Sequence, residues 1–231
     1  MVGEVPRLNR FAGAEAICYG SRTMTDDIET ILAASATIPG WTAGEDAKQV
    51  ARASLDLPDG ATIVEIGVFM GRCTVLLAGP RRLRGSGKVH CVDPFDCSGD
   101  AFSVPYYVNG LKAAGFDSLE NAFRHNLSRL GLAAWVEIHR GTSRDIATGW
   151  ARPIDLLLLD GDQSPEGARE AYESWIPFLK TGATIVLRNT EDRDYAEGHD
   201  GHRRLALEEL VAPRYAAIRQ VGATTFAVKA K

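Results

Sequence analysis

Two carboxylates follow a very apolar run near the middle of the chain. The stretch "LLLLDGDQSPEG" spans residues 156–167, and in it Asp160 and Asp162 flank a glycine. Four successive leucines are typical of a buried strand, and a buried strand that ends on carboxylates usually delivers them to a cleft. Ser164 and Pro165 then provide a helix cap and a first-turn proline. We therefore expect both aspartates to lie beside a ligand site.

Two earlier apolar runs also end on residues that could hold a ligand. "VEIGVFMGRC" carries Glu65 near the end of the first run, with Gly67 and Gly71 in the turn that follows. Glycines at such a turn let the backbone approach a ligand closely, although the third glycine of a pyrophosphate-binding fingerprint is missing. Asp93 ends the second run, where an acidic side chain can accept hydrogen bonds from a ribose diol. Together they favour an adenosine-type ligand, with a ligand-free tight turn and a turn-forming aspartate as the alternatives.

The elements that position these residues alternate between strand-like and helix-like patterns. Five short runs are apolar on successive residues, as in strands covered on both faces, and helical stripes lie between them. Alternating strands and helices predict parallel βαβ units, and hence an α/β fold with a doubly wound, mostly parallel, Rossmann-like sheet. The five runs end at Ile66, Asp93, Arg140, Asp160 and Arg188.

The end of the chain departs from this alternation. After a helical pattern at 202–212 and Pro213, two strand-like runs, "RYAAIRQV" and "ATTFAVK", flank Gly222. Strands joined by so tight a turn must pair antiparallel, since a parallel crossover needs a dozen or more residues. We therefore expect a seven-stranded sheet that ends in an antiparallel hairpin, unlike a plain dinucleotide fold.

Composition restricts the class of protein. The chain has 231 residues, 45% of them hydrophobic, and a net charge of −4. It can bury one full core, but it has no basic footprint for nucleic acid and no apolar run long enough to span a membrane. The N-terminus lacks the apolar core of a signal peptide, and the four cysteines include no CxxC pair. These features indicate a cytoplasmic protein with reduced thiols, which binds neither nucleic acid nor a membrane.

Five motifs in order carry a family resemblance. "VEIGVFMGRCT", "CVDPFD", "GTSRDI", "IDLLLLDGDQSPEG" and "FLKTGATIVL", followed by the hairpin, resemble class I S-adenosylmethionine-dependent methyltransferases. More narrowly, they are similar to small O-methyltransferases of the catechol type and to those that methylate sugars on natural products. The resemblance covers residues 45–231. It leaves 1–44 as a lid or an oligomer-contact segment, through which a homo-oligomer could form.

The resemblance implies a function and assigns roles to residues. It implies transfer of a methyl group from S-adenosylmethionine to a hydroxyl of a small molecule, such as a secondary metabolite or a sugar. By the same resemblance, the cofactor's methionine moiety lies near Glu65, Gly67 and Gly71, and its ribose diol contacts Asp93. Thr142 and Ser143 lie at the edge of its adenine, and the catalytic Asp160 lies beside its methyl group.

The sequence departs from metal-dependent relatives at two positions. Many relatives have a histidine after the Asp-Gly-Asp motif, where this chain has Gln163. Metal-dependent relatives end the fifth strand with Asp-Asn, Asp-Asp or His-Asp, and the aspartate of this pair joins Asp160 around a divalent cation. Here the two residues are Arg188 and Asn189. Mg²⁺ prefers several hard oxygen ligands, which Asp160, Asp162 and Asn189 could partly supply, but a neighbouring guanidinium competes for the carboxylates. We therefore assign no metal ligand and expect catalysis without a divalent metal.

Without a metal to acidify the acceptor hydroxyl, a side chain must take its proton. His199 and His202 follow the fifth strand, and an imidazole titrates near working pH. His202 is the stronger candidate, because a helix would fix its direction; a solvated polar loop is the alternative. Asp160 or Asp162 takes the role if neither histidine does. Tyr106 and Tyr107 are candidate walls of the acceptor pocket, or surface aromatics.

Two other functions remain open at this stage. One is a nucleotide-sugar or nicotinamide-dependent oxidoreductase, which the missing third glycine, the absence of a Tyr-x-x-x-Lys pair and the terminal hairpin disfavour. The other is a catalytically inactive cofactor-binding protein, which Arg188 in place of a metal-site acid keeps open.

Overall fold

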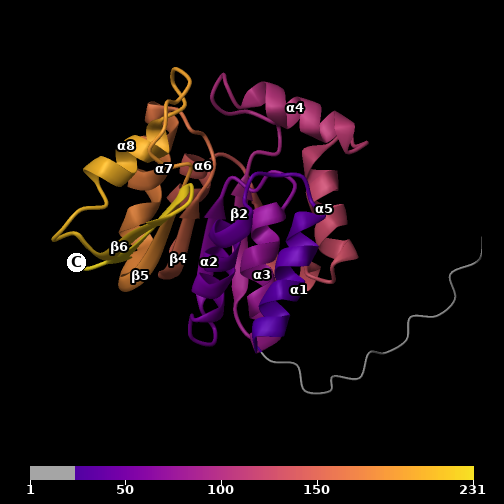
Figure 1. The fold of residues 1–231 in the computed structure, drawn as a ribbon, viewed down its shortest axis with the longest axis horizontal. Helices are drawn as coiled ribbons and strands as arrows, with labels where there is room; N and C mark the ends of the chain where they lie inside the picture. The colour runs from indigo at the N-terminus through magenta and orange to yellow at the C-terminus, as the bar shows by residue number, and fades with distance from the viewer. Residues whose placement is uncertain (1–23) are drawn as a thin grey trace, which may run out of the picture.

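A mixed seven-stranded sheet with helices on both faces forms the body of the computed structural model, which describes residues 24–231 (Figure 1). Its strand order is β3-β2-β1-β4-β5-β7-β6, with β1 to β5 parallel and β7 antiparallel to both neighbours. The predicted sheet and hairpin are therefore confirmed. The strands are β1 Thr62–Ile66, β2 Lys88–Asp93, β3 Val136–Arg140, β4 Ile154–Leu159, β5 Leu179–Arg188, β6 Tyr215–Val221 and β7 Thr224–Lys229.

The direction of strand order reverses between β1 and β4, which lie side by side at the centre of the sheet. Ile66 pairs with Leu159 at their carboxyl ends, and the N–H of Asp160 donates to the carbonyl oxygen of Ile66 (2.9 Å). The N–H of Gly67 donates to the carbonyl oxygen of Val92 on β2 (2.9 Å). The turns after β1 and β4 therefore meet at the switch point, where open α/β sheets bind ligands.

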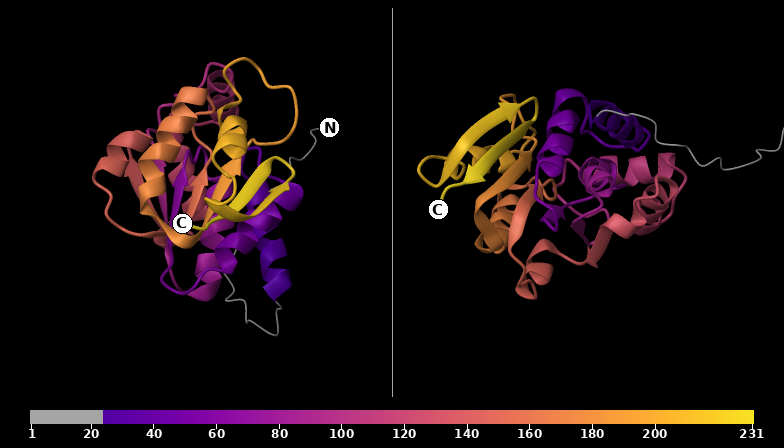
Figure 2. Two further views of the ribbon diagram at one scale, coloured as in Figure 1. Left: turned by 90° about the vertical axis from the view of Figure 1, so that its left-hand side faces the viewer. Right: turned by 90° about the horizontal axis from the view of Figure 1, so that it is seen from below.

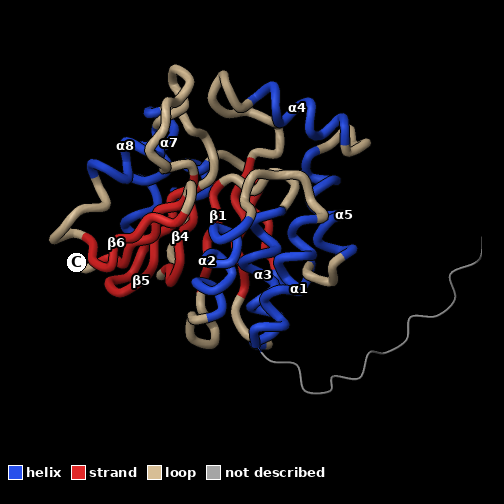
Figure 3. Tube along the Cα trace, in the orientation of Figure 1, coloured by secondary structure: helices blue, strands red, loops and turns tan. Residues whose placement is uncertain are grey.

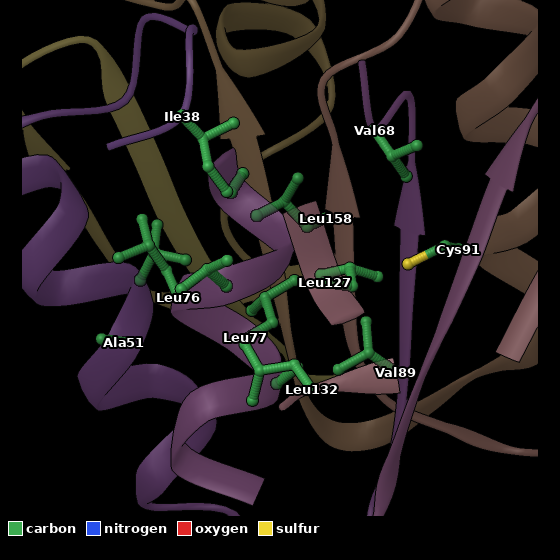
Figure 4. Packing of buried hydrophobic residues seen from close by; sticks show 14 of the residues in the cluster. Ile38, Ala51, Val68, Leu76, Leu77, Val89, Cys91, Leu127, Leu132 and Leu158 are labelled. Carbon is green, nitrogen blue, oxygen red and sulfur yellow. The ribbon is translucent and has the colours of Figure 1, made fainter. Parts of the chain in front are cut away.

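Helices cover one face of the sheet through a continuous apolar core. Strand residues that point to this face, including Val89, Cys91 and Leu158, pack against Leu76 and Leu77 of the helix that follows β1 (Figure 4). The helices of this layer are α1 Met24–Ala36, α2 Gly44–Leu55, α3 Arg72–Arg84 and α5 Leu119–Arg129.

The opposite face is covered by later segments of the chain. Alternate strand residues such as Val64, Val92 and Leu157 face this second core, in which Trp175 is fully buried. Ser164 caps the helix after β4 as predicted, since its Oγ accepts the N–H of Gly167 (3.0 Å). This layer holds α6 Ser143–Thr148, α7 Pro165–Trp175 and α8 Gly201–Glu208, while the short 3-10 helices are η1 Ala133–Trp135 and η2 Ile176–Phe178.

Long connections gather at the top of the molecule in the view of Figure 1, and Figure 3 shows the loops there in tan. They include α4, Val104–Ala113, in the connection between β2 and β3, and the loop at 189–200 after β5. The β6–β7 hairpin forms the opposite sheet edge from β3, and Figure 2 shows the hairpin in yellow.

The N-terminal segment 1–44 is described from residue 24 onward; residues 1–23, with Cys18, lie outside the described residues. Ile28 and Ile31 of α1 are buried in the first core, and Ile31 contacts the helix α3 at Gly79. A role of this segment as a lid or an oligomer contact stays a prediction. Over residues 24–231, no helix combines the length and the apolar character needed to cross a membrane.

Candidate functional site

A cavity of about 430 Å³ opens at the carboxyl ends of β1, β2 and β4. Its volume falls in the range of small-molecule sites. The loop at 39–42 and the helix α4 border it on the side away from the sheet. Of the residues singled out from the sequence, Gly67, Asp93, Thr142, Ser143, Asp160 and Asp162 line this cavity, whereas Glu65, Gly71, His199 and His202 do not.

The glycine turn after β1 is shaped by its neighbours in the protein. Gly67 has a φ of 80°, and a Cβ there would lie 2.4 Å from the Cα of Gly161. Gly71 has a φ of 93° at the start of α3, where a Cβ would lie 3.1 Å from the ring of Phe123. The turns after β1 and β4 can approach this closely only with glycine at position 67, and at position 71 glycine leaves room for Phe123, so the tight-turn interpretation holds alongside the ligand-binding one.

Asp93 connects the end of β2 to this glycine turn. Its Oδ2 accepts the N–H groups of Val68 (2.8 Å) and, more weakly, of Phe69 (3.4 Å), while its Oδ1 accepts the N–H of Phe95 (2.7 Å). Burial raises the pKa of Asp93, against these hydrogen bonds, which lower it. A carboxylate has about four acceptor positions, so one remains for a hydroxyl in the cavity.

Asp160 is the carboxylate at the centre of the site, at the end of β4. Its side chain is 28% exposed, and its Oδ2 lies 3.6 Å from Nε of the buried Arg188. Burial raises the pKa of Asp160 to about 6, although the nearby Arg188 cation lowers it. An acid with this pKa can hold or release a proton near neutral pH.

Arg188 is held in place by a second carboxylate from outside the sheet. Its Nη1 donates to Oδ2 of Asp46 on α2 (2.9 Å) and to Oγ1 of Thr224. The same Asp46 oxygen accepts the N–H of Ala223 (3.0 Å). The guanidinium therefore bridges Asp46 and Asp160 and ties α2, β4 and the hairpin together. The competition between Arg188 and a cation at Asp160, expected from the sequence, has a direct geometric basis.

Glu65 lies below the cavity rather than in its wall. The side chain is fully buried, and its Oε2 accepts the hydroxyl of Thr74 (2.7 Å), while Oε1 has no hydrogen-bond partner in the described structure. Burial raises the pKa of Glu65 to about 8. The carboxyl group is therefore protonated at neutral pH, and it lies beside Thr74 and Cys91.

The adenine-edging pair predicted from "GTSRDI" begins α6. Thr142 caps this helix, since its Oγ1 accepts the N–H of Asp145 (3.2 Å). Ser143 Oγ accepts Nε1 of Trp175 (2.9 Å), so its position is fixed from the second core. Both residues line the cavity next to the end of β2.

Neither candidate histidine reaches the cavity in this structure. His202 is 1% exposed, and its Nδ1 donates to the carbonyl oxygen of Arg188 (3.1 Å). Burial lowers the pKa of His202 to about 4, so the ring is neutral at working pH. His199 is also buried, with Nδ1 3.0 Å from Oδ1 of Asp100 and Nε2 3.2 Å from Nδ2 of Asn189. This geometry disfavours both histidines as the base.

Of the two polar residues that follow Asp160 in the motif, Asp162 stabilises the start of α7, whereas Gln163 contacts Asn189 after β5. Oδ1 of Asp162 accepts the N–H of Ser164 (2.8 Å), and Gln163 accepts Nδ2 of Asn189 at its Oε1 (3.3 Å). Gln163 is 4% exposed. Asp162 therefore serves the helix start as well as the cavity wall.

An aromatic wall, Trp41, Phe69 and Tyr107, completes the cavity. The ring of Phe69 lies 5.4 Å from those of Trp41 and Tyr107, and Trp41 is 60% exposed. Sequence reasoning selected Tyr107 but missed the other two. Tyr106, the other tyrosine predicted as a wall of the pocket, is exposed and outside the cavity.

Comparisons with known proteins agree with this arrangement. A family model described as "Methyltransferase domain" matches residues 64–190, which begin within β1 and include the glycine turn and the strands β2 to β5. Similar solved structures include a cofactor-bound protein, Rv0187 from MTB, with a TM-score of 0.61, 19% identity, and coverage of 90% of this chain and 92% of that one.

Two further solved structures share the fold. The O-methyltransferase TomG from Streptomyces achromogenes, involved in tomaymycin synthesis and solved with SAM, has a TM-score of 0.57 and 20% identity, covering 89% of this chain and 90% of its own. CalS11, a TDP-rhamnose 3'-O-methyltransferase of calicheamicin biosynthesis, has a TM-score of 0.51 and 14% identity, covering 91% and 96%. At these identities the likeness establishes the fold.

Proposed function

This chain belongs to the methyltransferase domain family, and we propose that it transfers a methyl group from S-adenosylmethionine to a hydroxyl oxygen of a small molecule. The observation that carries the proposal is the presence of Asp93 and Asp160 on one cavity, next to the glycine turn after β1. The family match supports the reaction type. Two of the solved structures named above, TomG and CalS11, are O-methyltransferases and support oxygen as the acceptor atom.

The chemistry of the cavity fits this cofactor. Asp93 has an acceptor position left for a ribose hydroxyl, and Thr142 and Ser143 line the same cavity and would hold the adenine. Asp160 offers a carboxylate to a positively charged group. When bound, S-adenosylmethionine supplies an electrophilic methyl group on a sulfonium sulfur, which leaves as a neutral thioether.

We assign the proton-accepting role to Asp160. It lines the cavity, and its pKa of about 6 leaves it ionised at neutral pH. The carboxylate takes the hydroxyl proton while the bond from acceptor oxygen to methyl carbon forms and the bond from methyl carbon to sulfur breaks. The chain's remaining contribution is alignment of the two reactants. The Arg188 cation beside Asp160 supports a reaction that needs no divalent metal such as Mg²⁺.

The aromatic wall supports an acceptor with a flat apolar surface. Trp41, Phe69 and Tyr107 offer ring faces on which a phenol or the apolar face of a sugar can stack. We therefore propose a hydroxylated aromatic metabolite or a sugar of secondary metabolism as the acceptor class. The unpaired thiols of Cys73, Cys91 and Cys97 support a reducing, cytoplasmic location.

The test begins with mass spectrometry of the purified full-length protein under native conditions. Retention of S-adenosylmethionine or its demethylated product is expected, and failure to bind either would overturn the cofactor assignment. Turnover is then measured with radiolabelled cofactor against hydroxylated aromatic compounds and sugars. Binding without turnover of any compound would favour the catalytically inactive alternative.

A further inference from the structure

Three metal-ligating side chains meet on the sheet, outside the cavity. They are His90 of β2 and Glu137 and His139 of β3, here called the His-Glu-His cluster. His90 pairs with Glu137 across the two strands, and His139 follows two residues later. All three therefore project from the same face of the sheet, because side chains two residues apart on a strand share a face.

The ligand atoms of the cluster lie at distances that suit a single small ion. His90 Nδ1 is 3.0 Å from His139 Nε2, and the Glu137 oxygens lie 3.6 Å from His90 Nδ1 and 3.7 Å from His139 Nε2. Bonds of roughly 2.0–2.1 Å in a tetrahedral zinc site separate neighbouring ligand atoms by about 3.3 Å. The three observed separations bracket this value. We propose that the His-Glu-His cluster binds a divalent transition-metal ion, with Zn²⁺ as the best match.

A metal ion binds imidazole through an unprotonated ring nitrogen. The hydrogen bond between the rings uses the two nitrogens that the ion requires. Moving the shared proton to the other nitrogen of its ring frees both without net proton release.

The surroundings hold the rings and leave one side open. The indole of Trp150 contacts His90 and His139 edge-on, with ring centroids 5.0 and 5.6 Å away. Glu137 is 41% exposed and His139 22% exposed, so an ion can enter from solvent and a water can complete its coordination. Because β3 is the edge strand, a bound ion would fasten it to β2, the strand that ends on Asp93.

The cationic neighbours of the cluster are Arg152 and Lys88. Arg152 Nη1 lies 3.4 Å from His90 Nε2 and 3.8 Å from an oxygen of Glu137, and its positive charge opposes a second cation. Lys88 adds a second positive charge that acts on His90. The Arg152 side chain is 61% exposed and can turn into solvent when an ion binds. Removal of its charge should therefore tighten metal binding.

The test is a titration of the chelator-treated full-length protein with ZnCl₂, followed by calorimetry. We expect about one equivalent to bind the wild type and a tetrahedral absorption signature when Co²⁺ replaces Zn²⁺. His139→Gln and Glu137→Gln should each weaken binding by at least about tenfold. Both positions are partly exposed, so these variants should fold. Arg152→Ala should bind more tightly than the wild type.

His125→Gln is the matched control, because His125 is an exposed histidine on α5, outside the cluster. It should bind as the wild type does. Failure of the wild type to bind Zn²⁺, or unchanged binding in both His139→Gln and Glu137→Gln, would overturn the proposal. None of these measurements requires methyltransferase activity, so the outcome is independent of the proposed function.

Discussion

Nε of Arg188 lies 3.6 Å from Oδ2 of Asp160, and this pair joins the ends of β5 and β4 beneath the cavity. Arg188 is 4% exposed, and Asp46 holds it from the other side. A divalent ion at Asp160 would have to lie beside this fixed positive charge, in a site that screens charge poorly. The cation also keeps Asp160 from the higher pKa that burial alone would give it.

From this pair we predict that methyl transfer does not depend on a divalent metal. Activity measured in excess EDTA should match activity in added MgCl₂, because Asp160 already has a cationic partner. The control is a metal-dependent methyltransferase assayed in the same buffers. Loss of activity in EDTA, with recovery on addition of Mg²⁺, would contradict the prediction and make Asp160 and Asn189 the first ligands to examine.

A second prediction concerns the proton acceptor. Asp160→Asn should lower kcat at saturating cofactor by about 10²–10⁴-fold, the usual contribution of a positioned general base. His199→Gln and His202→Gln should retain most of kcat, because neither ring lines the cavity. Since only the ionised carboxylate accepts a proton, wild-type kcat should rise with pH through about 6. A loss in His199→Gln as large as that in Asp160→Asn would transfer the role to the histidine.

The strands and the cofactor-side carboxylates could be predicted because both depend on local patterns. Apolar runs of strand length located β1 to β5, and the parallel order then brought Asp93 and Asp160 to one edge of the sheet. The helix α4 was missed, since its only buried residue is Leu111 and it therefore shows no apolar stripe. The helix α6 has six residues, too few to show a helical period.

The remainder of the site depends on contacts between distant segments. His199 contacts Asp100, which is 99 residues away, and His202 donates to the carbonyl oxygen of Arg188 at the end of β5. Their position after the fifth strand was predicted correctly. The direction of their side chains could not be predicted, because contacts with distant residues determine it. Trp41 lines the cavity from a loop before β1. It was missed because the prediction considered only residues that follow the ends of strands.

A third prediction tests Asp93, which supports the glycine turn as well as the proposed cofactor contact. Asp93→Ala should weaken S-adenosylmethionine binding by about 1.5–3 kcal/mol, as expected for a hydrogen bond to a charged group. It should also lower the free energy of unfolding by roughly 1–3 kcal/mol, because the N–H groups of Val68 and Phe95 lose their acceptor. Calorimetry and urea unfolding measure the two effects.

Asp96→Ala provides the control, since Asp96 is an exposed carboxylate on the same loop. It should leave cofactor affinity unchanged and cost little stability, because its Oδ1 accepts only the exposed N–H of Ser98 (2.9 Å). If Asp93→Ala folds and keeps wild-type affinity for the cofactor, Asp93 has only a structural role.

A fourth prediction concerns Glu65, whose pKa is about 8 in the folded protein against 4.5 for an ordinary glutamate. Between these values the unfolded chain releases a proton that the folded protein keeps, so stability falls as pH rises, by up to about 1.4 kcal/mol per pH unit. Gln cannot titrate. Glu65→Gln should therefore gain stability relative to the wild type as pH rises from 5 to 8, reaching a few kcal/mol in urea unfolding. An equal difference at both pH values would show that Glu65 titrates normally.

The last prediction concerns the acceptor side of the cavity. Trp41 is 60% exposed, stands on the rim and contacts Phe69 and Tyr107 with ring centroids 5.4 and 5.8 Å away. If an aromatic or sugar acceptor stacks on this wall, Trp41→Ala should raise its KM by roughly two- to tenfold, since such a ring contact contributes about 0.5–1.5 kcal/mol. Affinity for S-adenosylmethionine should hardly change, because Asp93 and Asp160 lie on the opposite, sheet side. Leu207→Ala is the control, as Leu207 is similarly exposed on α8 and outside the cavity. An unchanged KM in Trp41→Ala, or an equal rise in KM in Leu207→Ala, would show that the aromatic wall does not bind the acceptor.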